Sequence, residues 1–301
     1  MTHASENIIL SYEKKIGSLD KKNLKQLDDL GYCLIEKSDR LINWLEKDLK
    51  YITDFLENLL ILEGEKSGYE GREEHYKVGK KFEPTANRLG NLPNKDDVFK
   101  KFVMFPDLLR CAYHIIQDEI MFSSSNYREP IKNSGEQRLH IDWMPRQNIQ
   151  QNYESVIAML YLDDSTVENG ATKLIPKSHK FLGWPDESVN PFIDDDRIIS
   201  VPAKAGSILV INGNLWHKGG DNISGNRRRI INSTYRFRSL KQGLNQNLYI
   251  SNDNFNKMSY EEKFIFKILK SDYKQDEKIY GPGNIYREWL KKNPKKDYSK
   301  Q

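Results

Sequence analysis

The feature that most constrains the fold is a succession of short β-type segments between residues 120 and 237. Branched and aromatic residues fill runs such as "SVIAMLYL" (155–162), "SILVIN" (207–212) and "RIINSTYRF" (229–237). Residues of these types favour extended backbone. Turn-rich pieces such as "DDSTVENG" separate the runs. Many short strands at this spacing predict a sandwich or a barrel.

Helices are expected before and after this β region. The stretch "SDRLINWLEKDLKYITDFLENLLILEGE" repeats apolar residues every three or four positions, as an amphipathic helix does. "VFKKFVMFPDLLRCAYHIIQDEI", "SYEEKFIFKILK" and "NIYREWLKK" also read as helix, Tyr32–Ile35 as a short strand, and residues 64–98 as loops. We therefore expect one domain over 1–301, with a mostly helical part (1–118), a β core (119–238) and a helical extension (239–301).

The composition excludes several classes of protein. The 301 residues include 47 basic and 43 acidic side chains, a net charge of +4. This balance argues against a nucleic-acid partner, which calls for a clustered basic excess. Two cysteines without a CxxC pattern exclude a disulfide scaffold. The N-terminus does not resemble a signal peptide, and no apolar run approaches the roughly 18 residues of a membrane span. We expect a cytoplasmic monomer or homodimer without a membrane partner.

The stretch "RLHIDWMP" (138–145) contains two residues that bind metals well. His140 and Asp142 stand two apart, so on a strand both side chains point to the same face. Arg138 shares that face unless the strand bends. His217 in "GNLWHKGGDN" is the candidate for a third ligand. Two histidines and one carboxylate form the facial set of non-haem Fe(II), which leaves adjacent positions for a bidentate cosubstrate and for O₂.

Three consecutive arginines open the last β run. On a strand, Arg228 must face opposite to Arg227 and Arg229, which we expect on the surface. A buried arginine at a strand end needs an anionic partner. A dicarboxylate cosubstrate supplies one, because guanidinium and carboxylate match bidentately. A structural strand-end arginine is the alternative.

These residues resemble a known family. "RLHIDW", "ENGATKLIPKSHK" and "GSILVINGNLWHKGGDNISGNRRR" are similar to the motifs of the phytanoyl-CoA dioxygenase (PhyH-like) family of Fe(II)/2-oxoglutarate oxygenases. The family has an arginine eleven residues after its distal histidine, and here that position is Arg228. Two departures are Lys177, where the family usually has glycine, and Gly219, where some members have a serine. The resemblance covers residues 120–237 well and is weak elsewhere.

The resemblance implies the fold, the cofactors and the reaction. The expected fold is mainly β with α, a double-stranded β-helix (jelly-roll, cupin-like) core with N- and C-terminal helices. His140, Asp142 and His217 would bind Fe(II), and Arg228 would hold the far carboxylate of 2-oxoglutarate. O₂ and 2-oxoglutarate would be consumed to give succinate, CO₂ and a hydroxylated product. Members that halogenate have lost the carboxylate ligand, so Asp142 favours hydroxylation.

Other residues are weaker candidates. Thr172 and Leu160 lie on strands expected to line the cosubstrate pocket, although core packing is the simpler account of Leu160. Gln137 could touch cosubstrate or substrate, yet simple alternation turns it away from the site. His179 is better read as a turn histidine than as a fourth ligand. The candidates for substrate contact are Arg128, Arg138, Trp143, Arg146 and Trp216, for which salt bridging or ordinary packing is the alternative.

The resulting hypothesis is an iron- and 2-oxoglutarate-dependent dioxygenase that hydroxylates a small-molecule metabolite. Two alternatives stay open. The same fold could catalyse desaturation, epimerisation or cyclisation, because no residue in the sequence discriminates among these outcomes. A barrel of this kind could also bind metal without turnover, although the intact ligand set and Arg228 argue against that.

Overall fold

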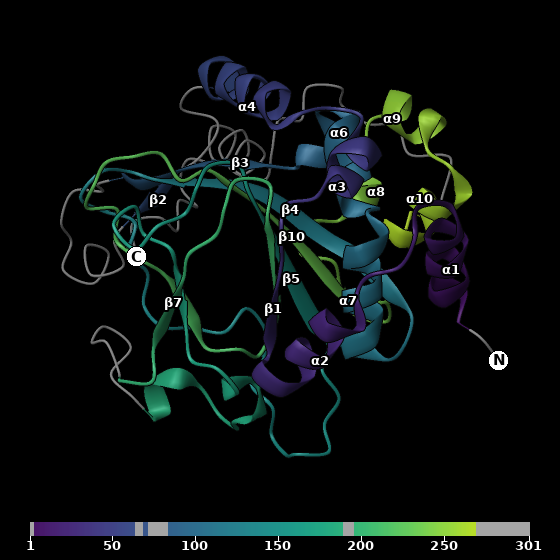
Figure 1. Cartoon of the computed structure of the whole chain (residues 1–301). Helices are drawn as coiled ribbons and strands as arrows, with labels where there is room; N and C mark the ends of the chain where they lie inside the picture. Colours follow the sequence, from purple (N-terminus) through teal and green to yellow (C-terminus); the bar gives the residue numbers. More distant parts are fainter. Residues whose placement is uncertain (1–2, 64–68, 72–83, 189–195, 269–301) are drawn as a thin grey trace, which may run out of the picture.

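Two β-sheets packed face to face form the centre of the protein. The computed structural model describes residues 3–63, 69–71, 84–188 and 196–268. The main sheet has the strand order β1-β8-β5-β10-β4-β3-β2, and the minor sheet has the order β7-β6-β9 (Figure 1). The strands are β1 Tyr32–Ile35, β2 Tyr69–Gly71, β3 Pro84–Gly90, β4 Ile120–Pro130, β5 Ser155–Tyr161, β6 Thr172–Leu174, β7 Ile199–Val201, β8 Ile208–Asn212, β9 His217–Gly219 and β10 Ile230–Phe237.

The chain passes back and forth between the two sheets. Residues 137–140 pair with β9 through an antiparallel bridge between His140 and His217, and so extend the minor sheet. From β4 onward the chain then visits main, minor, main, minor, minor, main, minor and main sheet, and neighbouring strands within each sheet are antiparallel in the described residues. This order is that of a jelly roll with two four-stranded sheets. The predicted double-stranded β-helix is confirmed.

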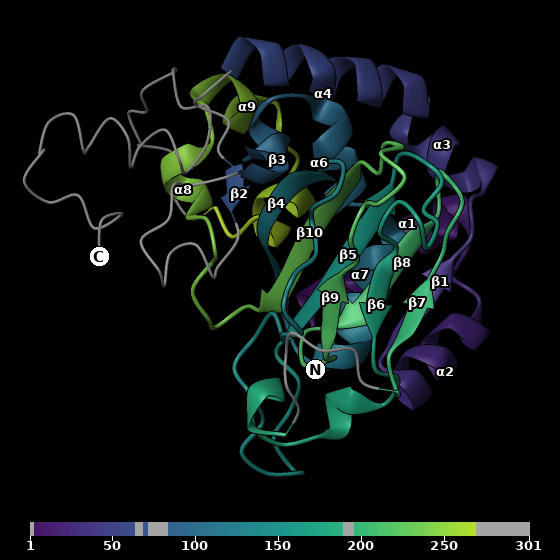
Figure 2. The same cartoon turned by 90° about the vertical axis from the view of Figure 1, so that its left-hand side faces the viewer.

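Helices cover the face of the main sheet that points away from the minor sheet. In Figure 1, α1, α2, α7 and α10 lie on one side of the main sheet and β7 on the other, and Figure 2 shows the minor sheet in front of the main sheet. The α-helices are α1 Ala4–Ile16, α2 Lys21–Leu30, α3 Asp39–Leu45, α4 Leu49–Glu63, α6 Asp97–Val103, α7 Pro106–Ile116, α8 Gln246–Tyr249, α9 Asn252–Lys257 and α10 Tyr260–Ile265. Short 3₁₀ turns are η2 Leu92–Asn94, η3 Ser178–Lys180 and η4 Pro185–Glu187.

Alternation along β5 separates two hydrophobic cores. Val156, Ala158 and Leu160 belong to the large core between the main sheet and the helices. Ile157 and Met159 point the other way, into the smaller core inside the jelly roll. Because both faces of the strand are covered, all seven residues of β5 are buried. The rigid strands that carry the inward-facing side chains are therefore supported from behind by the helical layer.

The N-terminal third contributes more β structure than the sequence indicated. The region 64–98 was expected to be loops, but β3 pairs with β4 and continues the main sheet. A strand of this kind forms because partner strands supply its hydrogen bonds, which local sequence does not reveal. The expected helix "NIYREWLKK" lies outside the described residues. Within the described part of the chain, each helix is too short or too polar to span a lipid bilayer.

Candidate metal centre and active-site cavity

His140, Asp142 and His217 meet inside the jelly roll, as the sequence predicted they would if they were ligands. Their donor atoms lie within 4.8 Å of one another. Nε2 of His140 is 3.7 Å from one Asp142 oxygen, and Nε2 of His217 is 3.5 Å from the other. The two imidazole centroids are 4.4 Å apart. One ion can touch all three side chains.

Backbone pairing explains why the two histidines converge. The amide of each donates to the carbonyl of the other, at 2.9 Å for His140 and 3.0 Å for His217. Residues paired in this way across two antiparallel strands place their side chains on the same face. The amide of Asp142 donates to the carbonyl of Gly213 at 3.1 Å, which fixes the next turn of the segment. The minor sheet therefore holds the two histidines, and the residue that follows β8 of the main sheet holds Asp142.

The hydrogen bonds of the imidazoles suit a metal. Nδ1 of His140 lies 2.8 Å from the carbonyl of Arg138, and Nδ1 of His217 lies 2.9 Å from the carbonyl of Leu215. A carbonyl oxygen only accepts, so each Nδ1 must carry a proton. In the neutral rings, Nε2 then keeps its lone pair for a cation. Metal-binding histidines are commonly oriented in this way.

The charge states of these side chains follow from their surroundings. Burial, and then the neighbouring His217, lower the pKa of His140 to about 4. Loss of solvent by itself would raise the pKa of Asp142, but His217, His140 and Arg88 lower it below the usual range. Burial opposes protonation of His217, but the pairing with Asp142 raises its pKa, so a metal ion would replace the proton that this pair shares. The site thus offers an ionised carboxylate and imidazole nitrogens, a donor set that suits Fe(II).

A cavity of about 240 Å³ opens next to the three side chains. Its volume is below the roughly 300–1,000 Å³ of typical drug-sized ligand sites, which indicates a small ligand. The lining comes from both sheets: Arg88, Ser124, Asn126, Arg128, Gln137, Ile157, Met159, Thr172, Gly219, Arg228, Ile230, Asn232, Thr234 and Arg236 accompany the three candidate ligands. Four arginines and one carboxylate are among these lining residues.

Arg228 lies at one end of this cavity. Its side chain is 1% exposed, and its Nε donates to the carbonyl of Asn169 at 3.3 Å. Thr172 is close by in the fold, since its hydroxyl lies 3.0 Å from that of Tyr161. Burial raises the pKa of Tyr161, and the nearby charge of Arg228 partly opposes that rise. Tyr161 was not singled out from the sequence. Arg228, Thr172 and Tyr161 form a polar corner between β5, β6 and β10.

The neighbouring arginines face the other way, as alternation requires. Arg229 donates to Asp163 through Nε at 2.8 Å and Nη2 at 2.6 Å. Arg227 pairs with Glu129 at 2.6 Å, and both arginines contact Glu57 of α4. The expectation that Arg228 faces opposite to Arg227 and Arg229 is met. These two are not merely exposed, since they tie the start of β10 to α4 and to the end of β5.

The position of Gln137 differs from simple alternation. Gln137 pairs with Gly219 and His140 pairs with His217, so three steps along one strand oppose two along the other. The extra residue is a bulge, and it turns Gln137 into the cavity while leaving Arg138 exposed. The Gln137 Oε1 accepts from the amide of Gly219 at 3.1 Å. A Cβ on Gly219 would lie 2.9 Å from that oxygen. Gln137 therefore occupies the space that a serine side chain at position 219 would need.

Three expected contacts are not made. Leu160 was a candidate for the cosubstrate pocket, but it points into the large core and is fully buried there, because its neighbours Met159 and Tyr161 take the inner face. Trp216 alternates with His217 and packs against the outer face of the minor sheet. Arg146 holds its own loop: it donates to the carbonyl of Gln151 at 3.1 Å and stacks on Tyr153.

Two further candidates lie at the cavity or beside it. Arg128 lines the cavity, is 3% exposed, and donates to the carbonyl of Gly135 at 2.8 Å. Trp143 stacks against Arg236, whose guanidinium carbon is 4.2 Å from the indole centroid. Arg236 lines the cavity and was not singled out from the sequence.

His179 takes no part in the site. It is 2% exposed and lies near α2, with Nε2 3.3 Å from the carbonyl of Asp28. A Cβ on Gly31 would lie 2.3 Å from its Nδ1, so the imidazole is packed tightly against the backbone. Lys177, two residues earlier, adopts φ of 68°. It therefore keeps the left-handed backbone that a glycine would adopt more easily.

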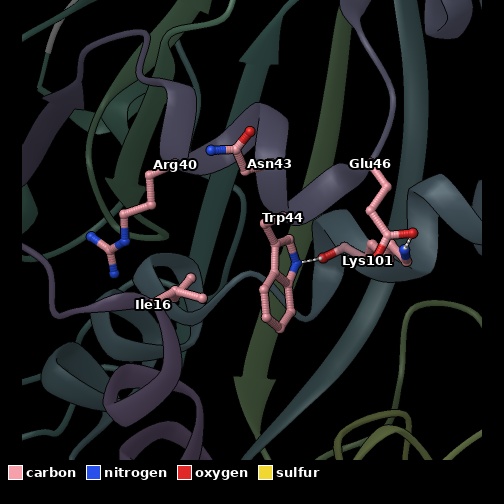
Figure 3. A pocket seen from close by; sticks show the side chains of 6 residues that line it. All are labelled: Ile16, Arg40, Asn43, Trp44, Glu46 and Lys101. Atoms are coloured by element: carbon pink, nitrogen blue, oxygen red, sulfur yellow. Dashed lines mark hydrogen bonds and ion pairs between the residues drawn. The ribbon is translucent and has the colours of Figure 1, made fainter.

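A wider hollow of about 580 Å³ lies among the helices α1, α3 and α6 (Figure 3). Its side chains connect these helices. Nε1 of Trp44 donates to the carbonyl of Lys101 at 2.7 Å, and the Lys101 ammonium pairs with Glu46 at 2.6 Å. It lies on the helical side of the main sheet and presents no metal-binding set.

Comparison with known proteins identifies the family of the chain. The family profile described as phytanoyl-CoA dioxygenase (PhyH) matches residues 27–230. The chain belongs to the phytanoyl-CoA dioxygenase family. Among curated members, dioxygenase af480 of Aspergillus fumigatus is 31% identical over 162 residues, which cover 50% of this chain and 48% of that one. Dioxygenase trt7 of Aspergillus terreus is 26% identical over 48% of this chain and 52% of that one. The chain thus spans about half the length of these relatives.

Solved structures with a similar fold were also found. HygX from Streptomyces hygroscopicus, with nickel and 2-oxoglutarate bound, aligns with a TM-score of 0.57 at 17% identity over 75% of this chain and 90% of that one. EctD from S. alaskensis, with bound Fe, aligns with a TM-score of 0.55 at 17% identity over 75% and 80%. At these identities the likeness concerns the fold alone.

Proposed function

We propose that the protein is an Fe(II)- and 2-oxoglutarate-dependent dioxygenase that hydroxylates a small molecule. The observation that carries the proposal is the convergence of His140, Asp142 and His217. The Nδ1–H group of each histidine donates to a backbone carbonyl, which leaves Nε2 for the metal. Fe(II) bound there would use 2-oxoglutarate and O₂ to oxidise a substrate C–H bond, with release of succinate and CO₂. Such chemistry needs open positions on the metal, which three ligands on one face leave.

The cosubstrate would lie between the metal ligands and Arg228. The buried guanidinium supplies the positive charge and the donor pair that a carboxylate needs. Thr172 and Gln137 line the same end of the cavity and offer further polar contacts. Ile157 and Met159 form an apolar wall that limits the access of water.

The proposed outcome is hydroxylation because Asp142 occupies the third ligand position. Other outcomes are tested by the same product measurement. SnoK, a carbocyclase of nogalamycin biosynthesis, aligns with a TM-score of 0.55, and SnoN, an epimerase of the same biosynthesis, with 0.54. Mass spectrometry separates the outcomes: hydroxylation adds one oxygen, cyclisation or desaturation removes two hydrogens, and epimerisation leaves the mass unchanged.

The first experiment measures metal binding, which does not require knowledge of the substrate. His217→Ala should weaken Fe(II) binding under anaerobic conditions by 100-fold or more, since even residues that only orient ligands cost about 10–100-fold when removed. The matched control is His179→Gln, which changes another buried histidine away from the cavity. Wild type and control should bind Fe(II) with the same affinity. Unchanged Fe(II) affinity in His217→Ala would refute the site.

A further inference from the structure

The cavity has two ends, and the backbone pairing places a different arginine at each. Arg228 bonds to the carbonyl of Asn169, just before β6, and β6 brings Thr172 opposite Gly219. At the other end, the amide of Asp142 donates to Gly213, and the amide of Gly213 donates to Ser155 at 2.8 Å.

Ser155 is the direct partner of Arg236 across β5 and β10. Arg236 and Asp142 therefore share the end of the cavity opposite Arg228, with His140 and His217 between them. The proposed function uses Arg228, and it leaves Arg236 without a role.

Arg236 is unusual for a half-buried cation. Among the described residues, no carboxylate lies within ion-pair distance of its guanidinium, and its Nε is buried without a hydrogen-bond partner. One weak bond runs from Nη1 to the carbonyl of Lys241, at 3.4 Å. Burial lowers the pKa of Arg236, and the charge of Asp142 opposes that shift. Burying a guanidinium without an anion is unfavourable, so the described residues leave a place for a further, anionic partner beside Arg236.

The side chain is nevertheless held in place. The guanidinium carbon of Arg236 lies 4.2 Å from the centroid of the Trp143 indole. The indole is itself fixed, because its Nε1 donates to Glu154 at 2.7 Å. Stacking covers one face of the planar group and leaves its N–H edge for hydrogen bonds in the plane. An arginine fixed in this way is preorganised for an oxyanion, because little rotamer freedom remains to be lost on binding.

Polar groups continue from Arg236 toward the metal ligands. Thr234 of β10 and Ser124 of β4 are cross-strand partners in the next row, and both line the cavity. Asn232 follows in the row beyond, and its Oδ1 is buried without a partner. This track would accommodate hydroxyl or amide groups of a polar ligand. The bulge of β4 near Ser123 lies between the row of Arg236 and the row of Thr234.

We propose that Arg236, stacked on Trp143, anchors an anionic group of the primary substrate, a carboxylate or a phosphate, at the end of the cavity away from 2-oxoglutarate. This inference rests on the proposed function, because it assigns Arg228 to the cosubstrate and Arg236 to the molecule that is oxidised. Arg236 is a specificity-determining residue: it selects small acids over their neutral counterparts. The anion would be held next to Asp142, so the attached carbon chain would extend toward the metal ligands.

The test uses calorimetric titration of the full chain, saturated anaerobically with Fe(II) and 2-oxoglutarate so that Arg228 is occupied. Inorganic phosphate, propionate and methyl phosphate are the probes, and propionamide is the neutral comparison. Wild type should bind at least one oxyanion saturably and propionamide at least tenfold more weakly. Arg236→Gln should weaken oxyanion binding at least tenfold, and Arg236→Lys should weaken it less. Preference for propionate or for methyl phosphate distinguishes a carboxylate from a phosphate substrate.

The matched control is Arg238→Gln. Arg238 is also half-buried and also stacks on an aromatic ring, Phe264 at 3.9 Å, but it faces α10 and does not line the cavity. It should bind the probes like wild type. Circular dichroism and the affinity for Fe(II) and 2-oxoglutarate, which should change less than twofold in Arg236→Gln, verify that the variants are folded.

Three results would overturn the proposal: no saturable oxyanion binding in wild type, equal binding of propionamide, or unchanged binding in Arg236→Gln. Failure of wild type to bind Fe(II) and 2-oxoglutarate would instead contradict the proposed function. In that case, phosphate titration of the metal-free protein still tests Arg236, because the variants change only that end of the cavity.

Discussion

The three consecutive arginines at the start of β10 allow one prediction with internal controls. Arg228 is 1% exposed, so a carboxylate bound to it would form a desolvated charge pair. Removing one partner of such a pair costs about 2–5 kcal/mol, which corresponds to about a 30- to 5,000-fold loss in affinity. Arg228→Gln should therefore raise the Kd for 2-oxoglutarate by this factor. Arg228→Lys should have a Kd between those of wild type and Arg228→Gln, because lysine keeps the positive charge but cannot donate two parallel hydrogen bonds to a carboxylate.

The neighbours should affect stability instead of affinity. The Arg229 side chain is 12% exposed and makes charged hydrogen bonds to Asp163 and Glu57. Arg229→Gln should lower the free energy of unfolding by about 1–3 kcal/mol. The Arg227 side chain is 44% exposed, so solvent screens its ion pairs with Glu129 and Glu57. Arg227→Gln should cost about 1 kcal/mol or less.

Calorimetric titration with 2-oxoglutarate under anaerobic Fe(II) gives the Kd, and urea denaturation gives the free energy of unfolding. The expected pattern is a loss of affinity in Arg228→Gln alone and a loss of stability mainly in Arg229→Gln. The assignment is wrong if Arg228→Gln keeps the affinity within threefold of wild type. It is equally wrong if Arg229→Gln, once shown to be folded, weakens 2-oxoglutarate binding as strongly as Arg228→Gln does.

Four further predictions test the packing around the site. Leu160→Ala should lower the free energy of unfolding by about 2–5 kcal/mol and leave the Kd for 2-oxoglutarate unchanged. An altered Kd in the folded variant would show that Leu160 contacts the cosubstrate pocket after all. Gly170→Ala, at φ of 89° and with its Cβ 2.5 Å from a backbone oxygen of Gly220, should cost about 1–3 kcal/mol in urea denaturation. Lys177→Gly should stabilise by about 0.5–1 kcal/mol, since the φ of 68° suits glycine; a loss of stability would contradict this. Burial lowers the pKa of His179 to about 4 from 6.5, so the unfolded chain takes up the proton first and stability falls as the pH drops from 6.5 toward 4. Between pH 7 and 5 that loss is about 2 kcal/mol, and His179→Gln should lose correspondingly less over the same interval.

Much of the site could be predicted because residue types and strand alternation are local properties. His140 and Asp142 stand two apart and share a face, and Arg228 faces opposite to its two neighbours, whatever the rest of the fold does. The same parity continues along β10 through Asn232, Thr234 and Arg236, which all line the cavity. That signal was present in "RRRIINSTYRF", and extending the alternation from Arg228 to the end of the strand would have found Arg236.

Other positions depended on contacts between distant parts of the chain. Simple alternation turned Gln137 away from the site, but a bulge opposite β9 turned it back, and a bulge exists only where two strands are paired. Trp216 and Arg146 flank the candidate ligands in sequence, yet one packs behind the minor sheet and the other fastens a loop. Nearness in sequence to a ligand did not indicate nearness in space.

By itself, the sequence predicted a sandwich or barrel, because strand propensity and alternation act over short range. Its family motifs added the jelly-roll class, the three candidate metal ligands and the candidate arginine for the cosubstrate. The tertiary structure alone decided which face of β5 meets the cavity, so that Met159 lines it and Leu160 does not. It also decided that Trp143 stacks under Arg236 at the end of the cavity opposite Arg228. Those arrangements come from the register and packing of two sheets, which bring together residues far apart in the chain.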